Sequence, residues 1–223
     1  MIRVLLIHDT YLLRTALASL VGRESDLEVS SASWLGAIAT FRALRPDVCV
    51  VDMDSPEAGG PRGIGALGGM TARCSRARRG VTGGSGGGDA GVPGDEGSAL
   101  LALATAGRPG PLRRAYEEGA LGYLSKNASP DRLVEGIRHV AKGERYIDES
   151  LGFGFLEAAA IPLTRRELSV LSLAAEGASV GEIARSLHLS NGTVRNYMAA
   201  ITRKTGARNR VDAIRISRGA GWL

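Results

Sequence analysis

The chain has 223 residues, a length that points to one large or two small domains. Apolar residues make up 44% and charged residues 23%, and the net charge is +5; these values are typical of a soluble protein. No apolar run is long enough to span a membrane, and the N-terminus lacks the pattern of a signal peptide. Two cysteines cannot supply a disulfide framework or a four-ligand zinc site. We therefore expect a soluble cytoplasmic protein.

Charge and glycine are unevenly distributed along the chain. Residues 160–223 carry ten Lys or Arg and four Asp or Glu, a net charge of +6, whereas residues 1–159 have a net charge of −1. This asymmetry is typical of a neutral module joined to one that binds nucleic acid, and a solvated basic face is the alternative.

Of the 31 glycines, 15 lie within 59–98. Because glycine disfavours helices, this segment is expected to be a flexible loop.

Short apolar runs alternate with helical patterns in the N-terminal part of the chain. The expected strands are 2–7, 27–31, 47–52, 100–105 and 121–124. The expected helices are 11–21, 33–44, 112–118 and 130–142. This alternation predicts a doubly wound parallel α/β sheet. No helical pattern is recognisable between the third and fourth strands.

Polar residues follow the strands at the carboxyl edge of the predicted sheet, where ligands bind in this architecture. Asp9, Asp52, Thr105 and Lys126 all fall there. Neighbouring carboxylates can hold Mg²⁺ next to a phosphoryl group, one carboxylate can form an acyl phosphate, and a lysine can pair with phosphoryl oxygens. In the alternative interpretation the aspartates only cap helices.

Three stretches resemble the receiver domains of two-component response regulators, which have a flavodoxin-like fold: VLLIHDTYLLRTAL, RPDVCVVDMDSP and EEGALGYLSKNASPDRLVEGIRHVAKGE. The resemblance implies that Asp52 is the phosphoacceptor and that a sensor histidine kinase is a partner. It implies a Mg²⁺ site made by Asp9, Asp52 and Asp54. The residues that it assigns to the conformational switch are Thr105, Tyr123 and Lys126.

The receiver pattern is atypical at three places. His8-Asp9 replaces a pair of acidic residues, which weakens the attraction for Mg²⁺. Ala104 falls where the family has a hydroxyl residue, and Thr105 serves only with a shift of one residue. The spacing from Asp52 to Ala104 is about twice the usual one because of the Gly-rich segment 59–98. That segment is open to three interpretations: a functional insertion, a drifted loop, or the product of a frame error.

The C-terminal part carries the start and stop signals of four helices. Thr164 and Glu167 form one capping box and Ser179 to Glu182 a second, which opens a helix over 180–187. Ser190 caps a helix over about 191–205, which Gly206 ends, and a last helix runs over about 210–217. Two short helices joined by a three-residue turn predict a helix-turn-helix.

The second helix of this unit is predicted to lie in the major groove. Arg195, Asn196 and Ala199 share one face, and Arg and Asn can read guanine and adenine. Hydroxyls at the helix N-terminus suit phosphate oxygens. An ordinary helical bundle with a basic surface is the alternative. The residues predicted to contact DNA are Ser190, Asn191, Thr193, Val194, Arg195, Asn196, Ala199, Arg203, Lys204, Arg208 and Arg210.

The stretch LTRRELSVLSLAAEGASVGEIARSLHLSNGTVRNYMAAITRKTGARNRVDAI looks like the LuxR-type helix-turn-helix of the NarL/FixJ regulators, and the whole chain is most similar to their DesR type. The resemblance implies a receiver domain at 1–143, a linker at 144–161 and an all-α DNA-binding domain at 162–223. It implies a transcriptional regulator that binds double-stranded DNA as a homodimer, paired through the first and last receiver helices.

The mode of control stays open at this stage. Phosphorylation of Asp52 is one route, and control by a ligand or a partner without phosphorylation is the other. A degenerate receiver that sequesters another protein is a rival from a different class. An enzyme is not expected, because the chain shows no metal-ligand cluster, nucleophile elbow or phosphate-binding glycine motif.

Overall fold

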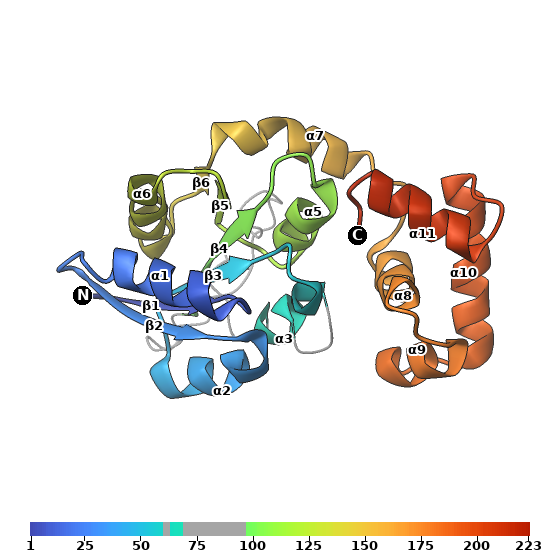
Figure 1. The fold of residues 1–223 in the computed structure, drawn as a ribbon, viewed down its shortest axis with the longest axis horizontal. Coiled ribbons are helices and arrows are strands. Elements are labelled where there is room, and N and C mark those ends of the chain that lie inside the picture. The colour runs from blue at the N-terminus through green and yellow to red at the C-terminus, as the bar shows by residue number, and fades with distance from the viewer. Residues whose placement is uncertain (60–62, 69–96) are drawn as a thin grey trace, which may run out of the picture.

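The computed structural model describes residues 1–59, 63–68 and 97–223. A parallel sheet with helices on both faces forms its N-terminal part, and a cluster of helices forms its C-terminal part (Figure 1). This arrangement confirms the predicted fold class. No helix within the described ranges is long and apolar enough to cross a bilayer. Most of the predicted Gly-rich segment, 59–98, lies outside the described residues.

Six strands form the sheet in the order β2-β1-β3-β4-β5-β6, and every neighbouring pair is parallel. The strands are β1 (Ile2–Ile7), β2 (Leu27–Ala32), β3 (Val48–Asp52), β4 (Ala99–Ala104), β5 (Gly122–Ser125) and β6 (Tyr146–Ile147). Central strands β3 and β4 are buried along their whole length because helices cover both faces. The register pairs Asp52 with Leu103, so β3 and β4 end at the same edge.

Two layers of helices cover the sheet (Figure 1). On one face, α1 (Tyr11–Val21) and α6 (Pro130–Ala141) bury Val21, Ile137 and Val140 against the strands. The opposite face is covered by α2 (Trp34–Leu44), α3 (Ile64–Gly68) and α5 (Pro109–Glu117), which share a second apolar core. A short 3-10 helix, η1 (Pro56–Gly59), precedes α3. The prediction of a flexible loop over 59–98 is therefore wrong for residues 64–68, which form α3; five residues are too few to show a periodic pattern.

The predicted linker, 144–161, is largely regular structure. Its first residues form β6, which pairs with β5, and a 3-10 helix, η3 (Glu149–Leu151), leads into α7 (Gly152–Ala159). Gly154 lies so close to α5 that an added Cβ would come within 2.7 Å of Leu112. A strand of two residues is too short to show the alternation of apolar and polar residues that marks a strand, and the sequence therefore predicted only a linker here.

Four helices form the C-terminal unit, and its apolar core is separate from those of the sheet. They are α8 (Arg165–Ala175), α9 (Val180–Leu187), α10 (Asn191–Thr205) and α11 (Arg210–Gly219). Both predicted capping boxes are present, and Ser190 accepts a hydrogen bond from the Thr193 N–H. Gly206 ends α10 with φ at 68°, a left-handed conformation that glycine adopts without strain.

Glu167 joins the first capping box to α10. Its carboxylate is buried and accepts hydrogen bonds at 2.7 Å from both the Thr164 N–H and the Lys204 ammonium. Burial by itself would raise the pKa of Glu167, but Lys204 and Thr164 outweigh it and hold the pKa below its usual value. A lowered carboxyl pKa stabilises the fold above the unfolded-state pKa and ceases to do so as the pH falls through the folded-state value.

Glu167→Gln is expected to lower the free energy of unfolding by about 1–3 kcal/mol at pH 7, because it removes charge-assisted hydrogen bonds. The deficit should shrink as the pH falls below about 4.3, the unfolded-state pKa of glutamate. Urea unfolding followed by circular dichroism at both pH values measures this. The matched control is Glu176→Gln, an exposed change near the end of α8 that should alter stability little. A deficit of constant size at every pH would contradict the account.

Candidate phosphorylation site and DNA-binding surface

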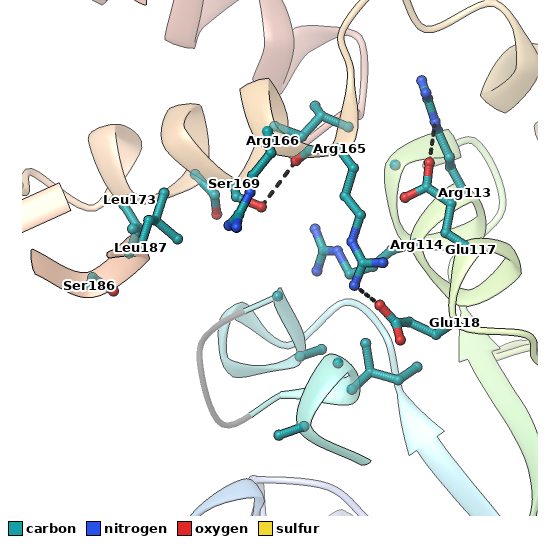
Figure 2. Close-up of a pocket in the computed structure, with 18 of the residues that line it drawn as sticks. Arg113, Arg114, Glu117, Glu118, Arg165, Arg166, Ser169, Leu173, Ser186 and Leu187 are labelled. Carbon is teal, nitrogen blue, oxygen red and sulfur yellow. Dashed lines mark hydrogen bonds and ion pairs between the residues drawn. The ribbon is translucent and has the colours of Figure 1, made fainter. Parts of the chain in front are cut away.

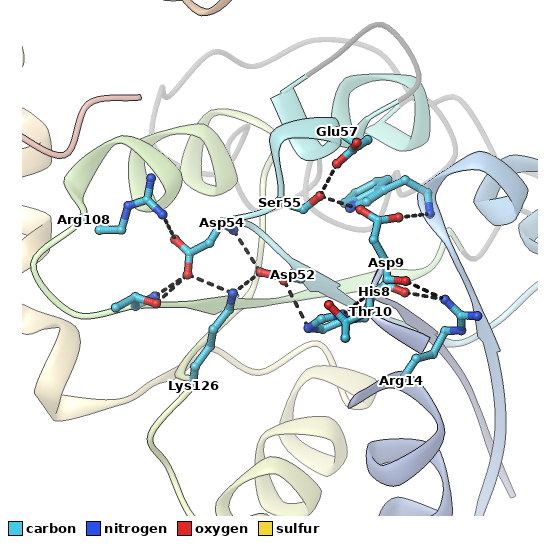
Figure 3. A network of polar contacts seen from close by, with 12 residues as sticks. His8, Asp9, Thr10, Arg14, Asp52, Asp54, Ser55, Glu57, Arg108 and Lys126 are labelled. Atoms are coloured by element: carbon cyan, nitrogen blue, oxygen red, sulfur yellow. Dashed lines mark hydrogen bonds and ion pairs between the residues drawn. The ribbon is translucent and has the colours of Figure 1, made fainter. Parts of the chain in front are cut away.

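Asp52, the last residue of β3, is held on both of its carboxylate oxygens (Figure 3). Oδ1 forms an ion pair with the Lys126 ammonium and also accepts the Asp54 N–H at 3.0 Å. Oδ2 lies 3.3 Å from Nε2 of His8. Nδ1 of His8 accepts the Thr10 N–H at 3.0 Å, which fixes the ring so that its Nε2 side faces Asp52. The carboxylate is only 6% exposed.

Lys126 also bridges to Asp54, whose carboxylate lies on the other side of the ammonium at 3.0 Å. Oδ2 of Asp54 accepts the Thr105 hydroxyl at 2.6 Å and the Thr105 N–H at 3.0 Å. Its Oδ1 lies 3.5 Å from the Arg108 guanidinium. Thr105, a predicted switch residue, is thus brought into the network, while Ala104 ends β4 beside it.

Asp9 turns away from this network. Its oxygens accept the Trp34 N–H at 3.1 Å and the Ser55 hydroxyl at 2.6 Å. The same hydroxyl lies 2.7 Å from Glu57 Oε2. Partial burial would raise the pKa of Asp9, but the hydrogen bonds from Ser55 and Trp34 prevail and hold the pKa below its ordinary value. Asp9 therefore acts here as a cap for the start of α2.

The predicted Mg²⁺ ligands do not converge. Mg²⁺ requires near-octahedral oxygen ligands around one point. Asp9 is directed towards Trp34 and Ser55, whereas Asp52 and Asp54 are directed towards Lys126. Among the described residues, no three acidic, histidine or cysteine side chains are grouped so that they could hold a metal ion. The residues present therefore do not fit a Mg²⁺ ion in this arrangement.

Tyr123, the other predicted switch residue, is buried. Its hydroxyl donates to the Ala120 carbonyl at 3.0 Å, and its ring meets Phe155 of α7 edge to face at 4.8 Å between centroids. Of the three predicted switch residues, Thr105 and Lys126 lie within the acidic network, while Tyr123 extends from β5 and packs against Phe155 of α7.

On the C-terminal unit, α10 presents an exposed polar face. Arg195, Asn196 and Ala199 are exposed on it, as is Arg203 towards its end. Further predicted DNA contacts that are exposed at the ends of α10 are Ser190, Asn191 and Arg208; Thr193 is half-buried and lies against Ser190.

Three of the predicted DNA contacts make contacts within the unit itself. Val194 is fully buried in the core of the unit because it lies on the inward stripe of α10. The Lys204 ammonium is held by Glu167. The Arg210 guanidinium donates to the carbonyls of Ala174 and Ala178 and so caps the end of α8. Val194 is thereby excluded from direct contact with DNA, whereas Lys204 is held by Glu167 but stays exposed, and Arg210 is half-buried.

Comparison with known proteins agrees with this architecture. Residues 161–217 match the family described as bacterial regulatory proteins, luxR family. The response regulator RamR of Streptomyces coelicolor is 47% identical over 223 residues, which cover 100% of this chain and 98% of that protein. The transcriptional regulatory protein DesR of Bacillus subtilis is 34% identical over the full length of both chains. The chain belongs to the luxR family of response regulators. It is a DNA-binding transcriptional regulator of the two-component class.

Solved structures of response regulators share the fold of this regulator. ChrA, from a heme-sensing two-component system, is 25% identical with a TM-score of 0.51 over 100% of this chain and 98% of that one. RcsB from Salmonella enterica serovar Typhimurium, solved on promoter rprA with the phosphomimetic BeF3⁻, is 18% identical with a TM-score of 0.67, over 97% and 98% of the two chains. At that identity the likeness to RcsB concerns the fold alone. The predicted membership of this family is confirmed. Within it, RamR, at 47% identity, is more similar to this regulator than DesR, at 34%.

Sequence reasoning missed two residues of the network, Ser55 and Arg108. Arg108 spans the two parts of the regulator: one guanidinium nitrogen lies near Asp54, and the other donates to the Leu223 carbonyl at 2.8 Å. Next to it, the Gly110 N–H donates to the Gly221 carbonyl at 2.9 Å. Arg108 lies shortly after the end of β4. This position is the sequence feature that could have placed it at the acidic edge.

The acidic edge of this regulator is expected to bind Mg²⁺ only when position 8 carries a negative charge in place of His8. His8→Asp removes the imidazole beside Asp52 and adds a further carboxylate next to Asp9, which favours a divalent cation. Calorimetric titration with MgCl₂ should show a saturable binding event in His8→Asp and none in the unaltered chain. The control is His8→Asn, which removes the imidazole without adding charge. Comparable Mg²⁺ binding by the unaltered chain would contradict the geometric argument.

Proposed function

We propose that this regulator binds double-stranded DNA as a homodimer on two half-sites, with α10 of each copy in the major groove. The observation that carries the proposal is the orientation of α10. Val194 and Ile201 anchor its inner side in the core, which leaves Arg195 and Asn196 exposed on the outer side. A guanidinium can pair with guanine and a carboxamide with adenine, so these two side chains supply base readout.

Contacts to the DNA backbone would come from both ends of α10. Ser190 and Asn191 lie at its N-terminus, where hydroxyl and backbone N–H groups suit phosphate oxygens. Arg203 and Arg208 lie near its C-terminal end and are exposed. Lys204 and Arg210 are engaged within the unit. We therefore assign phosphate neutralisation to Arg203 and Arg208.

Dimerisation is supported by apolar side chains that this chain leaves exposed. One helix-turn-helix reads only a few base pairs, so a second copy adds affinity and specificity. Leu12 and Leu13 of α1 are 74% and 50% exposed, and α1 lies beside α6 in the helix layer predicted to form the dimer. Val211 of α11 is 74% exposed and offers a further contact on the DNA-binding unit.

The acidic network supports control by a ligand or partner in preference to Mg²⁺-dependent phosphorylation. Asp52 remains the predicted phosphoacceptor, yet Lys126 and His8 already engage both of its oxygens. A sensor histidine kinase is therefore not a required partner in this proposal. We place the regulator in the cytoplasm, where bacterial DNA is accessible, and assign it no enzymatic activity.

Arg195→Ala and Asn196→Ala are each expected to weaken binding to a footprinted genomic fragment by about 5- to 150-fold, which corresponds to the 1–3 kcal/mol of a base contact. Arg203→Ala should weaken binding to all sequences and reduce the salt dependence by about one phosphate contact. Mobility shifts at several salt concentrations measure both effects. Arg42→Ala, an exposed change on α2, is the control. Unchanged DNA binding by the double Arg195→Ala, Asn196→Ala variant would contradict the proposal, as would a footprint of one half-site.

A further inference from the structure

A cavity of about 510 Å³ lies between the receiver and the DNA-binding unit (Figure 2). Its walls come from η1, α3 and α5 on one side and from α8 and α9 on the other. That volume lies in the range of small-molecule sites. The charged residues described on its walls are Arg113, Arg114, Glu117, Glu118, Arg165, Arg166 and Glu176.

Four of these charges form two internal pairs. Arg113 donates to Glu117 at 3.1 Å and also to the Ile161 carbonyl at 3.0 Å. Arg165 forms an ion pair with Glu118 across the cavity, from α8 to the end of α5. What is left is two arginines, Arg114 and Arg166, against one carboxylate, that of Glu176. The lining therefore carries an excess of positive charge.

Arg114 is the half-buried one of these two arginines, whereas Arg166 is exposed. Its guanidinium lies against the backbone of Gly59, where an added Cβ would come within 2.6 Å of Nη1, so the glycine makes room for it. Within the described parts of the chain, no group accepts a hydrogen bond from this guanidinium. Burial, and next the charge of Arg108, lower the pKa of Arg114. A half-buried guanidinium that faces a cavity without a hydrogen-bond acceptor is favourably placed to pair with an anion.

We propose that this cavity binds a small organic anion whose carboxylate or phosphate group is held by Arg114, with Arg166 as a second cation. A guanidinium presents paired N–H donors that match the two oxygens of either group. The apolar part of the ligand would lie along Leu168, Leu173 and Leu187, which line the same cavity. This site is separate from the acidic edge around Asp52 and from the exposed face of α10.

An occupant would touch both parts of the regulator and would therefore stabilise their present arrangement relative to any other. This consequence gives a chemical identity to the ligand control proposed above, and it rests on that proposal. Anion binding itself does not rest on the proposed function, because the titration measures it on the full-length chain in the absence of DNA. Failure of anion binding and failure of DNA binding are thus separate results.

The test is a titration of the full-length chain with inorganic phosphate, with sodium octanoate and, at equal ionic strength, with sodium chloride. The readout is the arginine side-chain Nε–Hε resonances in nuclear magnetic resonance spectra. Phosphate or octanoate should produce a saturable shift, half-complete at roughly 1–10 mM, an affinity usual for so small a probe. Saturation by phosphate alone identifies a phosphorylated ligand, and saturation by octanoate alone identifies a carboxylate with an apolar body. No saturable shift with either probe would overturn the proposal.

Variants localise the binding. Arg114→Met should abolish the saturable shift, and Arg166→Gln should raise the half-saturation concentration at least threefold. Arg42→Gln, on the far helix α2, should leave it unchanged. Because Arg114→Met changes a partly buried side chain, circular dichroism checks its fold, and the exposed Arg166→Gln decides the matter if that variant unfolds. Equal shifts in all variants would place the binding elsewhere and would overturn the proposal.

Discussion

The ammonium of Lys126 is the interaction on which the arrangement of the acidic edge depends. β3 delivers Asp52 and the turn after it delivers Asp54, while Lys126 directly follows β5 on the other side of β4. Parallel strands end at one edge, so these groups must meet there. The Lys126 ammonium contacts both carboxylates, the Arg108 guanidinium adds a second positive charge beside Asp54, and Nε2 of His8 lies near the remaining oxygen of Asp52. A pair of carboxylates that would otherwise repel each other is thereby stable without a metal ion.

From this edge a chain of polar contacts leads to the DNA-binding unit. Asp54 lies next to Arg108, and Arg108 donates to the Leu223 carbonyl at the C-terminus. The ion pair of Arg165 with Glu118 joins the two parts at a second place, on the wall of the arginine-lined cavity. At these two places the receiver is thus connected to the helix-turn-helix through ionic and polar groups.

Sequence patterns predicted the features that short-range chemistry determines, and missed those that depend on distant partners. The capping boxes at Thr164 and Ser179 and the strand that ends at Asp52 follow from neighbouring residues, and the structure has them. Asp9 has the spacing of a metal ligand, but its hydrogen bonds to Ser55 and Trp34 arise only when the strands assemble. Lys204 and Arg210 carry the charge of DNA contacts, but only the folded unit shows that Glu167 and the end of α8 engage them.

The most direct test of the central claim is the chemistry of Asp52 in the presence of Mg²⁺ and a small phosphodonor such as acetyl phosphate. Intact-protein and peptide mass spectrometry measure the phosphoryl adduct on this residue. Because Lys126 occupies one oxygen of Asp52 and the predicted Mg²⁺ ligands do not converge on one point, we predict no adduct in the unaltered chain, and an adduct at Asp52 in His8→Asp. A stoichiometric adduct on Asp52 of the unaltered chain, lost in Asp52→Ala, would contradict it.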